Sequence, residues 1–450
     1  MLPADRPISC KSSESSCAMP LPQSFLSSCS SLTSAWELTT GSHVLIFILR
    51  SYDKLFLNSS NDFEGDVFWI SDRWVWKLHT LRAIYFWVLS KKKRANLRSH
   101  EIRVAVAGAG SALSGMVQAI SLYKKGDGRG LLHPVLGEYS PSDVEIVAVF
   151  DVDKRKVGKT LKQALFVEQS ALPKYTEVEF DTKVLPGVLK DERLQGRLEV
   201  ETSDEQTVTQ EIERSGAQIL LNLINGGMYA SSEAYARCAL KAGVAFVNAT
   251  PTPIATSLEL EALFSSNKLP LLGDDLLSQI GGTILHTFLL WFLNSRGVWV
   301  KQTYQLDVGG GLENLLTVED DELKLTKRTI KSSTVSSVLP YQANIATGTT
   351  EYVDFMGNSR ESHFEIVGSY TLGAPLEIEL TLRTQDGANA AGPLLDAIRA
   401  AKVALDRGIG GALEEVNPYL FKLVRSKVDP ISAEKNFIKF FERRKEIGLE

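Results

Sequence analysis

The chain of 450 residues has few cysteines and histidines, and neither set shows a metal-ligand pattern. Its four cysteines are Cys10, Cys17, Cys29 and Cys238, and none has the spacing of a zinc or redox motif. The six histidines are scattered, with no HxxxH or HExxH pair. We therefore expect no disulfide framework and no histidine-rich metal site, which is typical of a protein of the reducing cytoplasm.

The chain also lacks long apolar runs and an excess of positive charge. Residues 44–49 and 83–89 are apolar but far shorter than the roughly 20 residues that span a bilayer. The start has no basic segment followed by an apolar one, which argues against a signal peptide. The formal net charge of -5 argues against a nucleic-acid partner. We expect neither nucleic acid nor membrane as a partner.

The first hundred residues differ from the rest in composition. Residues 1–42 are rich in Ser, Pro and Cys without a sustained period, so we expect disorder. The basic run of residues 91–98 is either a localisation or lipid-surface signal or, more commonly, a solvated linker. No function is assigned to residues 1–100.

A glycine-containing stretch, residues 104–118, organises the remainder. Small apolar residues end in Gly108 and Gly110, and an apolar-periodic segment follows directly. This predicts a buried parallel strand that turns tightly into a helix, where backbone N–H groups and the helix dipole would face a pyrophosphate. The alternative is a plain turn in an α/β domain.

Beyond this stretch, strand and helix patterns alternate, which predicts a parallel doubly wound sheet. Ligands bind at the carboxyl edge of such sheets. The polar or glycine residues that follow the predicted strands are Asp151, Asn225-Gly226-Gly227, Asn248 and Asp274-Asp275. Asp151 is the predicted ribose ligand, and its carboxylate would repel a 2′-phosphate, which favours NAD over NADP.

The pattern changes after residue 300. Residues 376–382 alternate between apolar and polar, as in an antiparallel strand with one buried face, and residues 302–308 and 364–370 are its expected partners. Residues 392–407 are amphipathic and predict a helix that returns to the first domain. The expected organisation is a Rossmann-like NAD-binding domain (101–275), an α+β domain with an open sheet (276–390), to which the resemblance described below assigns catalysis and oligomerisation, and a C-terminal return (391–450).

Three lysines are candidates for an anion site. Lys327 and Lys331 share one face if residues 322–333 are helical, and like charges brought together would lower the pKa of one of them. The alternative is a solvated basic face. Lys402 has the alternative of pairing with Asp406 or Asp396 at the surface.

From about residue 101 to 425 the chain resembles the myo-inositol-1-phosphate synthases, particularly the compact bacterial and archaeal type. The segments that carry the resemblance are Phe150-Asp151-Val152-Asp153 with Lys156-Val157-Gly158, residues 242–251, Gly273-Asp274-Asp275 with Ser278-Gln279, Val308-Gly309-Gly310, Lys327 with Lys331, and Asp386, Asn389, Ala391-Gly392 and residues 396–408.

The resemblance implies an isomerase that uses NAD without net redox change. D-Glucose 6-phosphate would be oxidised at C5, lose a C6 proton, close by aldol attack on C1 and be reduced again to 1D-myo-inositol 3-phosphate. Enolate and aldol oxyanion would need cationic donors. Related enzymes are tetramers, and some use a divalent cation or ammonium.

The resemblance also implies roles for individual residues. Lys327, Lys331 and Lys402 would stabilise the oxyanions, Asp275 would lie near the nicotinamide, and Asp386 would orient a lysine. The implied cofactor-binding residues are Gly108, Gly110, Ser111, Asp151, Asn225, Asn248, Asp274 and Ser278. Gly310, Arg360 and Asn389 would bind the substrate.

Several positions depart from the family pattern, among them the first turn, which has Ser111-Ala112 where an asparagine is common. Leu277 and Arg360 stand where a lysine is usual, and Asp307 and Gly311 where an asparagine is usual. A guanidinium keeps the charge but does not transfer protons. Two hypotheses follow: an active synthase, or a divergent member that binds NAD or a sugar phosphate without cyclising it, as a binding or regulatory protein. An ordinary NAD dehydrogenase is a third.

Overall fold

The computed structural model describes residues 44–47, 56–59, 100–168, 171–194 and 196–442. Two compact units are present, residues 1–92 and residues 93–450. In the first, β1 (Val44–Phe47) pairs antiparallel with β2 (Phe56–Ser59). The predicted disorder of residues 1–42 and the basic run of residues 91–98 lie outside the described residues.

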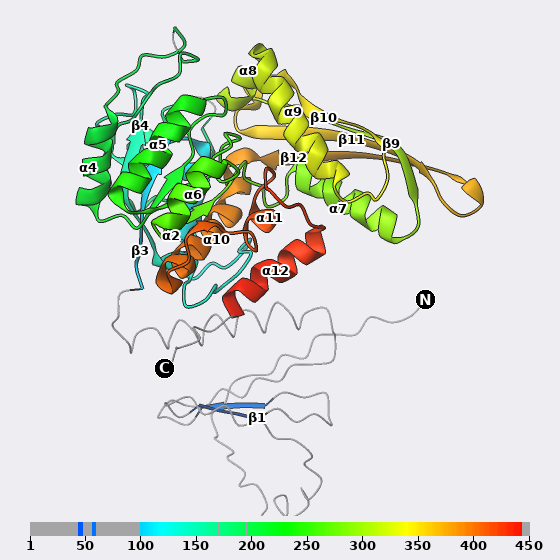
Figure 1. Ribbon diagram of the computed structural model, residues 1–450, viewed down its shortest axis with the longest axis horizontal. Helices are drawn as coiled ribbons and strands as arrows, with labels where there is room; N and C mark the ends of the chain where they lie inside the picture. The colour runs from blue at the N-terminus through cyan, green and yellow to red at the C-terminus, as the bar shows by residue number, and fades with distance from the viewer. Residues whose placement is uncertain (1–43, 48–55, 60–99, 169–170, 195, 443–450) are drawn as a thin grey trace, which may run out of the picture. The chain divides into compact units, whose positions relative to one another are not determined.

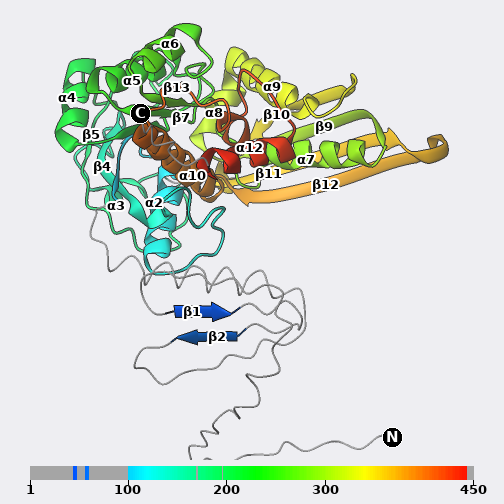
Figure 2. The ribbon, with the colours of Figure 1, turned by 60° about the horizontal axis from the view of Figure 1, so that its bottom comes forward.

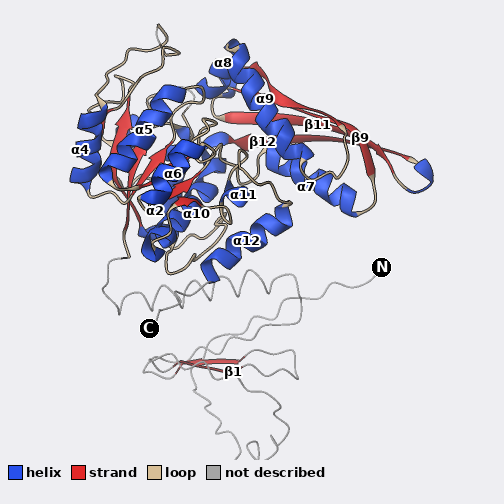
Figure 3. Cartoon of the chain, in the orientation of Figure 1, coloured by secondary structure: helices blue, strands red, loops and turns tan. Residues whose placement is uncertain are grey.

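A seven-stranded sheet forms the larger part of the second unit (Figures 1 and 3). Its strands are β3 (Ile102–Ala107), β4 (Val144–Asp151), β5 (Val184–Pro186), β6 (Ile219–Asn222), β7 (Ala245–Asn248), β8 (Pro270–Leu272) and β13 (Gly411–Ala412). All neighbouring pairs are parallel, in the order β13-β8-β7-β6-β3-β4-β5. The order reverses between β3 and β6, so the predicted doubly wound sheet is confirmed, with its switch point at the glycine turn.

Helices cover both faces of this sheet. On one face lie α2 (Ser111–Lys124), α10 (Asp386–Arg407) and α12 (Pro430–Glu442) (Figure 2). On the other lie α4 (Glu205–Ser215), α5 (Tyr229–Ala242) and α6 (Leu258–Ser266). Successive β3 residues point to opposite faces, so Val104 and Val106 pack under α2 and α10 while Ala105 and Ala107 pack under the second layer. Both faces of β3 are thus packed against helices, which explains why its sequence is apolar apart from the half-buried Arg103.

A four-stranded mixed sheet forms the rest. Its order is β10 (Asn344–Tyr352), β9 (Trp299–Gly309), β11 (Ser359–Ser369) and β12 (Pro375–Gln385). The three predicted strands are present, but β11 lies between β9 and β12, so the predicted pairing of β12 with β9 is wrong. The sequence did not predict β10, which runs parallel to β9.

Two helices, α7 (Gly282–Ser295) and α9 (Asp321–Ser336), cover one face of the mixed sheet (Figure 1). Leu290, Val300, Val335 and Ile366 form its small core. The shorter elements are α3 (Leu161–Ala164), α8 (Leu312–Glu319), α11 (Asn417–Leu420) and the 3-10 turns Pro141–Asp143, Asp354–Met356 and Thr371–Gly373.

Helices α2 and α10 touch through their backbones. A Cβ placed on Gly115 would lie 1.9 Å from the Gly387 carbonyl oxygen, so only glycine permits this approach. The contact brings the first turn of α10, which begins at Asp386, next to the helix that follows the glycine turn. Helix α10 therefore places the end of the mixed sheet beside the glycine turn of the parallel sheet.

Candidate functional site

One cleft of about 380 Å³ lies at the carboxyl edge of the parallel sheet and is also lined by the mixed sheet and α9. Twelve of the sixteen predicted site residues line it: Gly108, Gly110, Ser111, Asp151, Asn225, Asp275, Ser278, Lys327, Lys331, Arg360, Asp386 and Asn389. The cleft therefore contains the glycine turn at one end and cationic side chains at the other.

The glycine turn has the geometry of a pyrophosphate site. Gly108 has φ 100°, and a Cβ there would lie 2.7 Å from the Leu223 carbonyl oxygen. Gly110 is the N-cap of α2, no side chain caps it, and a Cβ there would meet nothing within 4 Å. The helix N-terminus is thus open on the side that faces the cleft, which is where backbone N–H groups bind phosphate.

Asp151 lies at the end of β4 and is tied to that turn. Its Oδ2 accepts a hydrogen bond from the Ala109 amide at 2.7 Å, and its Oδ1 accepts from the Asp153 amide at 2.9 Å. Lys156, to which the sequence assigned no role, lies 3.8 Å from Asp151 and pairs with Glu168. Burial would lower the pKa of Lys156, but the two carboxylates outweigh it and raise it.

The loop after β6 meets the second sheet region at Gly226. The Gly226 amide donates to the Glu313 carboxylate at 2.9 Å, and that carboxylate also pairs with Lys327. A Cβ on Gly226 would come within 2.7 Å of Glu313 Oε1 and 3.1 Å of Lys327 Cε. A side chain at this position would displace the ends of Glu313 and Lys327, so the glycine leaves room for this ion pair at the loop.

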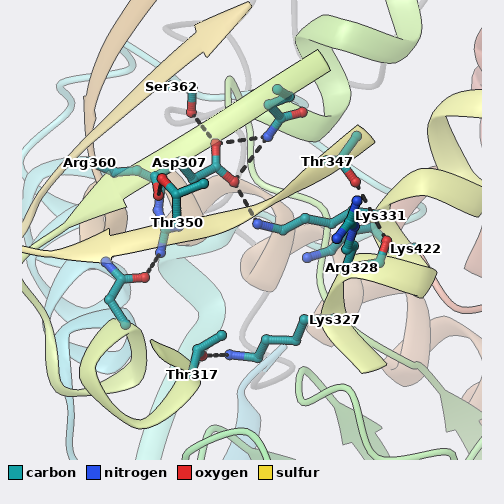
Figure 4. A network of polar contacts seen from close by, with 12 residues as sticks. Asp307, Thr317, Lys327, Arg328, Lys331, Thr347, Thr350, Arg360, Ser362 and Lys422 are labelled. Carbon is teal, nitrogen blue, oxygen red and sulfur yellow. Dashed lines mark hydrogen bonds and ion pairs between the residues drawn. The ribbon is translucent and has the colours of Figure 1, made fainter. Parts of the chain in front are cut away.

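Four cations gather at the other end of the cleft, and each has its own carboxylate. The ion pairs are Lys327 with Glu313, Lys331 with Asp307 (2.6 Å), Arg360 with Asp386 (2.8 Å) and Lys422 with Asp275 (2.6 Å). Figure 4 shows the cations converging from α9, β11 and the segment after α11.

The Asp307–Lys331 pair is the most buried of the four. Burial would raise the pKa of Asp307, but the Lys331 ammonium and the Arg360 guanidinium hold it far below its ordinary value. Burial lowers the pKa of Lys331, and Asp307 opposes that shift. Asp307, one of the departures from the family pattern, is therefore an anion inside the cationic cluster.

Sequence patterns did not predict Lys422. It follows α11 in an irregular segment whose backbone pairs with residues 274–277: the Lys422 amide donates to the Asp275 carbonyl, and the Leu423 amide to the Asp274 carbonyl. Asp275 itself has φ 60°, an uncommon conformation for a residue other than glycine. This tertiary pairing, rather than any local spacing, sets Lys422 against Asp275.

Lys402 is a correction. It pairs with Asp406 one helical turn later and lies 5.2 Å from the centre of the Tyr139 ring, outside the residues that line the cleft. The partner is one that the alternative named, although the Lys402 side chain is only 12% exposed. Lys402 lies in the C-terminal half of α10, next to the loop that contains Tyr139. The part of α10 that lines the cleft is its N-terminal end.

Asn248 and Asp274 are also corrections, because they lie beneath the cleft instead of lining it. Both are fully buried, and Asn248 Nδ2 donates to Asp274 Oδ1. Asp274 also accepts from the amides of Ile254, Ala255 and Thr256. Burial raises the pKa of Asp274 to about 6, and these donors oppose the shift. The pair holds a loop in place.

Two further predicted roles need correction. Gly310 packs against backbone, since a Cβ there would lie 2.6 Å from the Gly357 nitrogen, and it is not among the lining residues. Asp386 orients Arg360 and not a lysine. Asn389 lines the cleft, but its amide group is bonded to the Ile280 backbone on both sides.

Among the residues that the structure describes, no group of three or more His, Cys, Asp or Glu side chains is arranged to hold a metal ion. The structure therefore gives no support to the divalent cation that the resemblance implies for some members. Within the same described ranges, no helix has the length and apolar character needed to cross a membrane.

Comparisons with known proteins agree with this geometry. The family model described as myo-inositol-1-phosphate synthase matches residues 281–387. Curated proteins named inositol-3-phosphate synthase from Mycolicibacterium smegmatis and Corynebacterium glutamicum are each 34% identical, over 72% and 71% of this chain and 93% of their own length.

Solved structures show the same fold. The protein Ari2 is 29% identical with a TM-score of 0.62, covering 76% of this chain and all of its own. A myo-inositol-1-phosphate synthase-related protein from Thermotoga maritima is 23% identical with a TM-score of 0.65, covering 76% of this chain and 98% of its own. The structures show the fold, and the curated relatives show that the chain belongs to the myo-inositol-1-phosphate synthase family.

Proposed function

We propose that the protein is an inositol-3-phosphate synthase that converts D-glucose 6-phosphate to 1D-myo-inositol 3-phosphate with bound NAD. The observation that carries the proposal is the convergence of Lys327, Lys331, Arg360 and Lys422 in the cleft that also contains the glycine turn. Curated relatives with this activity in their names, at 34% identity over most of the chain, support it.

The nucleotide end fits NAD. Gly110 leaves space in front of the α2 N-terminus for a pyrophosphate. Asp151 retains acceptor capacity for ribose hydroxyls beyond its two backbone donors, and its negative charge disfavours a 2′-phosphate. The chemistry that NAD supplies when bound is reversible hydride transfer.

The cationic end fits the charge that the reaction develops. Removal of the C6 proton places negative charge on the C5 oxygen, and ring closure places it on the C1 oxygen. Fixed cationic donors stabilise such oxyanions. At comparable sites each donor increases the rate about 10²–10³-fold. Lys327, Lys331 and Lys422 take this role, so Lys422 replaces the predicted Lys402. Arg360, which stays protonated and is held by Asp386, is suited to binding the phosphate.

The test is turnover. Purified protein is incubated with NAD and glucose 6-phosphate, and product is measured as periodate-released phosphate. We expect product without accumulation of NADH. The Lys422→Met variant should lose at least about 100-fold in rate, whereas the matched Lys402→Met variant keeps its rate. Net NADH would indicate an ordinary dehydrogenase instead.

The second candidate function is a non-cyclising binding or regulatory protein. Leu277 favours it, because the lysine usual at this position would add a cation to the cleft. Gly311 likewise brings no side chain where an amide is usual. Calorimetric binding of NAD and glucose 6-phosphate with no product under any condition would favour this candidate over the synthase.

The family resemblance further suggests a homotetramer that acts in the cytoplasm, with or without a divalent cation. Light scattering coupled to size-exclusion chromatography tests the oligomeric state of the purified chain. Dialysis against a chelator, followed by the turnover assay, tests the cation. An unchanged rate after dialysis would remove the divalent cation from the proposal.

A further inference from the structure

Asp307 occupies a central position in the cationic cluster. It lies on β9 and is 1% exposed. Its Oδ2 accepts from Lys331 Nζ at 2.6 Å and its Oδ1 accepts from Ser362 Oγ at 2.6 Å, as Figure 4 shows. Gln305 Nε2 lies 2.8 and 3.0 Å from the two oxygens. The carboxylate is thus fixed by side chains from two strands and one helix.

Lys331 is surrounded by groups that oppose its charge. It is 9% exposed, and two cations face it from other elements: Arg360 on β11 and Lys422 after α11. Lys327 lies one turn away on α9 itself. Burial and like charge both favour a neutral amine.

The other carboxylates of the cleft are engaged elsewhere. Glu313 pairs with Lys327, Asp386 with Arg360, and Asp275 with Lys422. Among the described residues, Asp307 is the carboxylate within ion-pair distance of Lys331. A single buried anion therefore balances this ammonium group.

We propose that Asp307 is a positioning residue that keeps Lys331 protonated and aimed into the cleft, so that Lys331 acts as a fixed ammonium donor and not as a proton acceptor. The catalytic meaning of this assignment rests on the proposed synthase reaction, whereas the protonation of Lys331 does not. The asparagine usual at this position in the family would orient the amine without balancing its charge.

The direct test measures the protonation of Lys331 without turnover. Trace acetylation with acetic anhydride from pH 6 to 11, followed by mass spectrometry, reports the neutral fraction of each lysine. Lys427 provides a comparison within the same molecule, because burial lowers its pKa to about 8 and, in the described part of the chain, its ammonium donates to the Ser333 hydroxyl and not to a carboxylate. We expect Lys331, although more buried, to have its acetylation midpoint at higher pH than Lys427. A midpoint at or below that of Lys427 would overturn the proposal.

Variants isolate the contribution of Asp307. Asp307→Asn, which keeps the shape, should increase acetylation of Lys331 at pH 8 at least about tenfold, as a shift of one pH unit implies. Ser362→Ala removes a hydrogen bond to the same carboxylate but no charge, and should leave the midpoint within about 0.3 pH units, well inside the one-unit effect of charge removal. Equal profiles for wild type and Asp307→Asn, or equal shifts in both variants, would refute the assignment.

Turnover then gives a separate result. If the synthase reaction is found, Asp307→Asn should move the alkaline limb of the kcat profile to lower pH, and Asp307→Glu should restore part of it. An unchanged limb would show that protonated Lys331 is not used in catalysis. If the wild type has no turnover, the proposed function fails while the acetylation result stands.

Discussion

Replacement of Gly115 by alanine tests the helix contact that joins the two parts of the site. The added Cβ would lie 1.9 Å from the Gly387 oxygen and 2.5 Å from its carbonyl carbon, and real Cβ atoms do not come within 3.0 Å of such atoms. Helices α2 and α10 must therefore separate by about 1 Å. Overpacking of this kind costs about 1–3 kcal/mol.

The expected fall in the thermal midpoint follows from the size of the unit. A typical unfolding entropy of about 2 cal/mol/K per residue, over a unit the length of residues 93–450, converts each kcal/mol into about 1–2 °C. Gly115→Ala should therefore lower the midpoint by about 1–6 °C in differential scanning fluorimetry. Because Gly387 follows Asp386, the shift should also disturb the Asp386–Arg360 pair and weaken binding of glucose 6-phosphate.

The matched control is Gly128→Ala. A Cβ on Gly128 would meet no atom within 4 Å, and the residue has no left-handed φ, so the variant adds a methyl group without a clash. The same midpoint for Gly115→Ala, Gly128→Ala and wild type would show that the backbone contact does not limit the packing of α2 on α10.

Three further predictions concern the carboxylates of the parallel sheet. Asp274→Asn should lower the thermal midpoint more than replacement of the exposed Asp181 by asparagine. The new side-chain NH₂ group would point at backbone N–H groups that now donate to the Asp274 carboxylate, and two donors cannot bond to each other. Since burial raises the pKa of Asp274 from 3.8 to about 6, the folded state takes up a proton first, and wild-type stability relative to Asp274→Asn should rise as the pH falls from about 7 to 5. Unchanged differences across that range would contradict the shift. Asp151→Ser should weaken NAD binding about tenfold in calorimetry and narrow its preference over NADP; an equal loss for both nucleotides would argue against charge repulsion.

Much of the parallel sheet could be predicted because its signals are local. A buried strand such as β3 is a short apolar run that ends at glycine or a polar residue, and the helix after it shows a 3.6-residue period. The mixed sheet was harder. Strand β10 has a Thr- and Gly-containing sequence without clean alternation, and its parallel pairing with β9 depends on two intervening helices. Helix α7 begins only at Gly282, because the residues before it form a loop, of which residues 275–278 and Gly281 line the cleft.

The site divides in the same way. The rule for strand ends singled out Asp151, and the i,i+4 spacing singled out Lys327 and Lys331; all three line the cleft. Each rule depends on a single element of secondary structure. Lys422 could not be found by such rules, because its place depends on backbone pairing with a segment almost 150 residues earlier. Lys402 shows the converse: its helix was predicted, although from residue 392 and not from Asp386, but which face of a long helix reaches the cleft is decided by tertiary packing.

The pairing of each cation with a carboxylate also distinguishes the lysines from one another. An anionic substrate must compete with the existing partner of any cation it binds. The Glu313 side chain is 38% exposed, so water can replace Lys327 when that ammonium turns toward a ligand. The Asp307 side chain is 2% exposed, and loss of Lys331 would leave a buried charge without its counterion, which is strongly unfavourable. We therefore expect Lys327 to exchange partners on binding and Lys331 to remain fixed, so that the two lysines of one helical face differ in function because their carboxylates differ in burial.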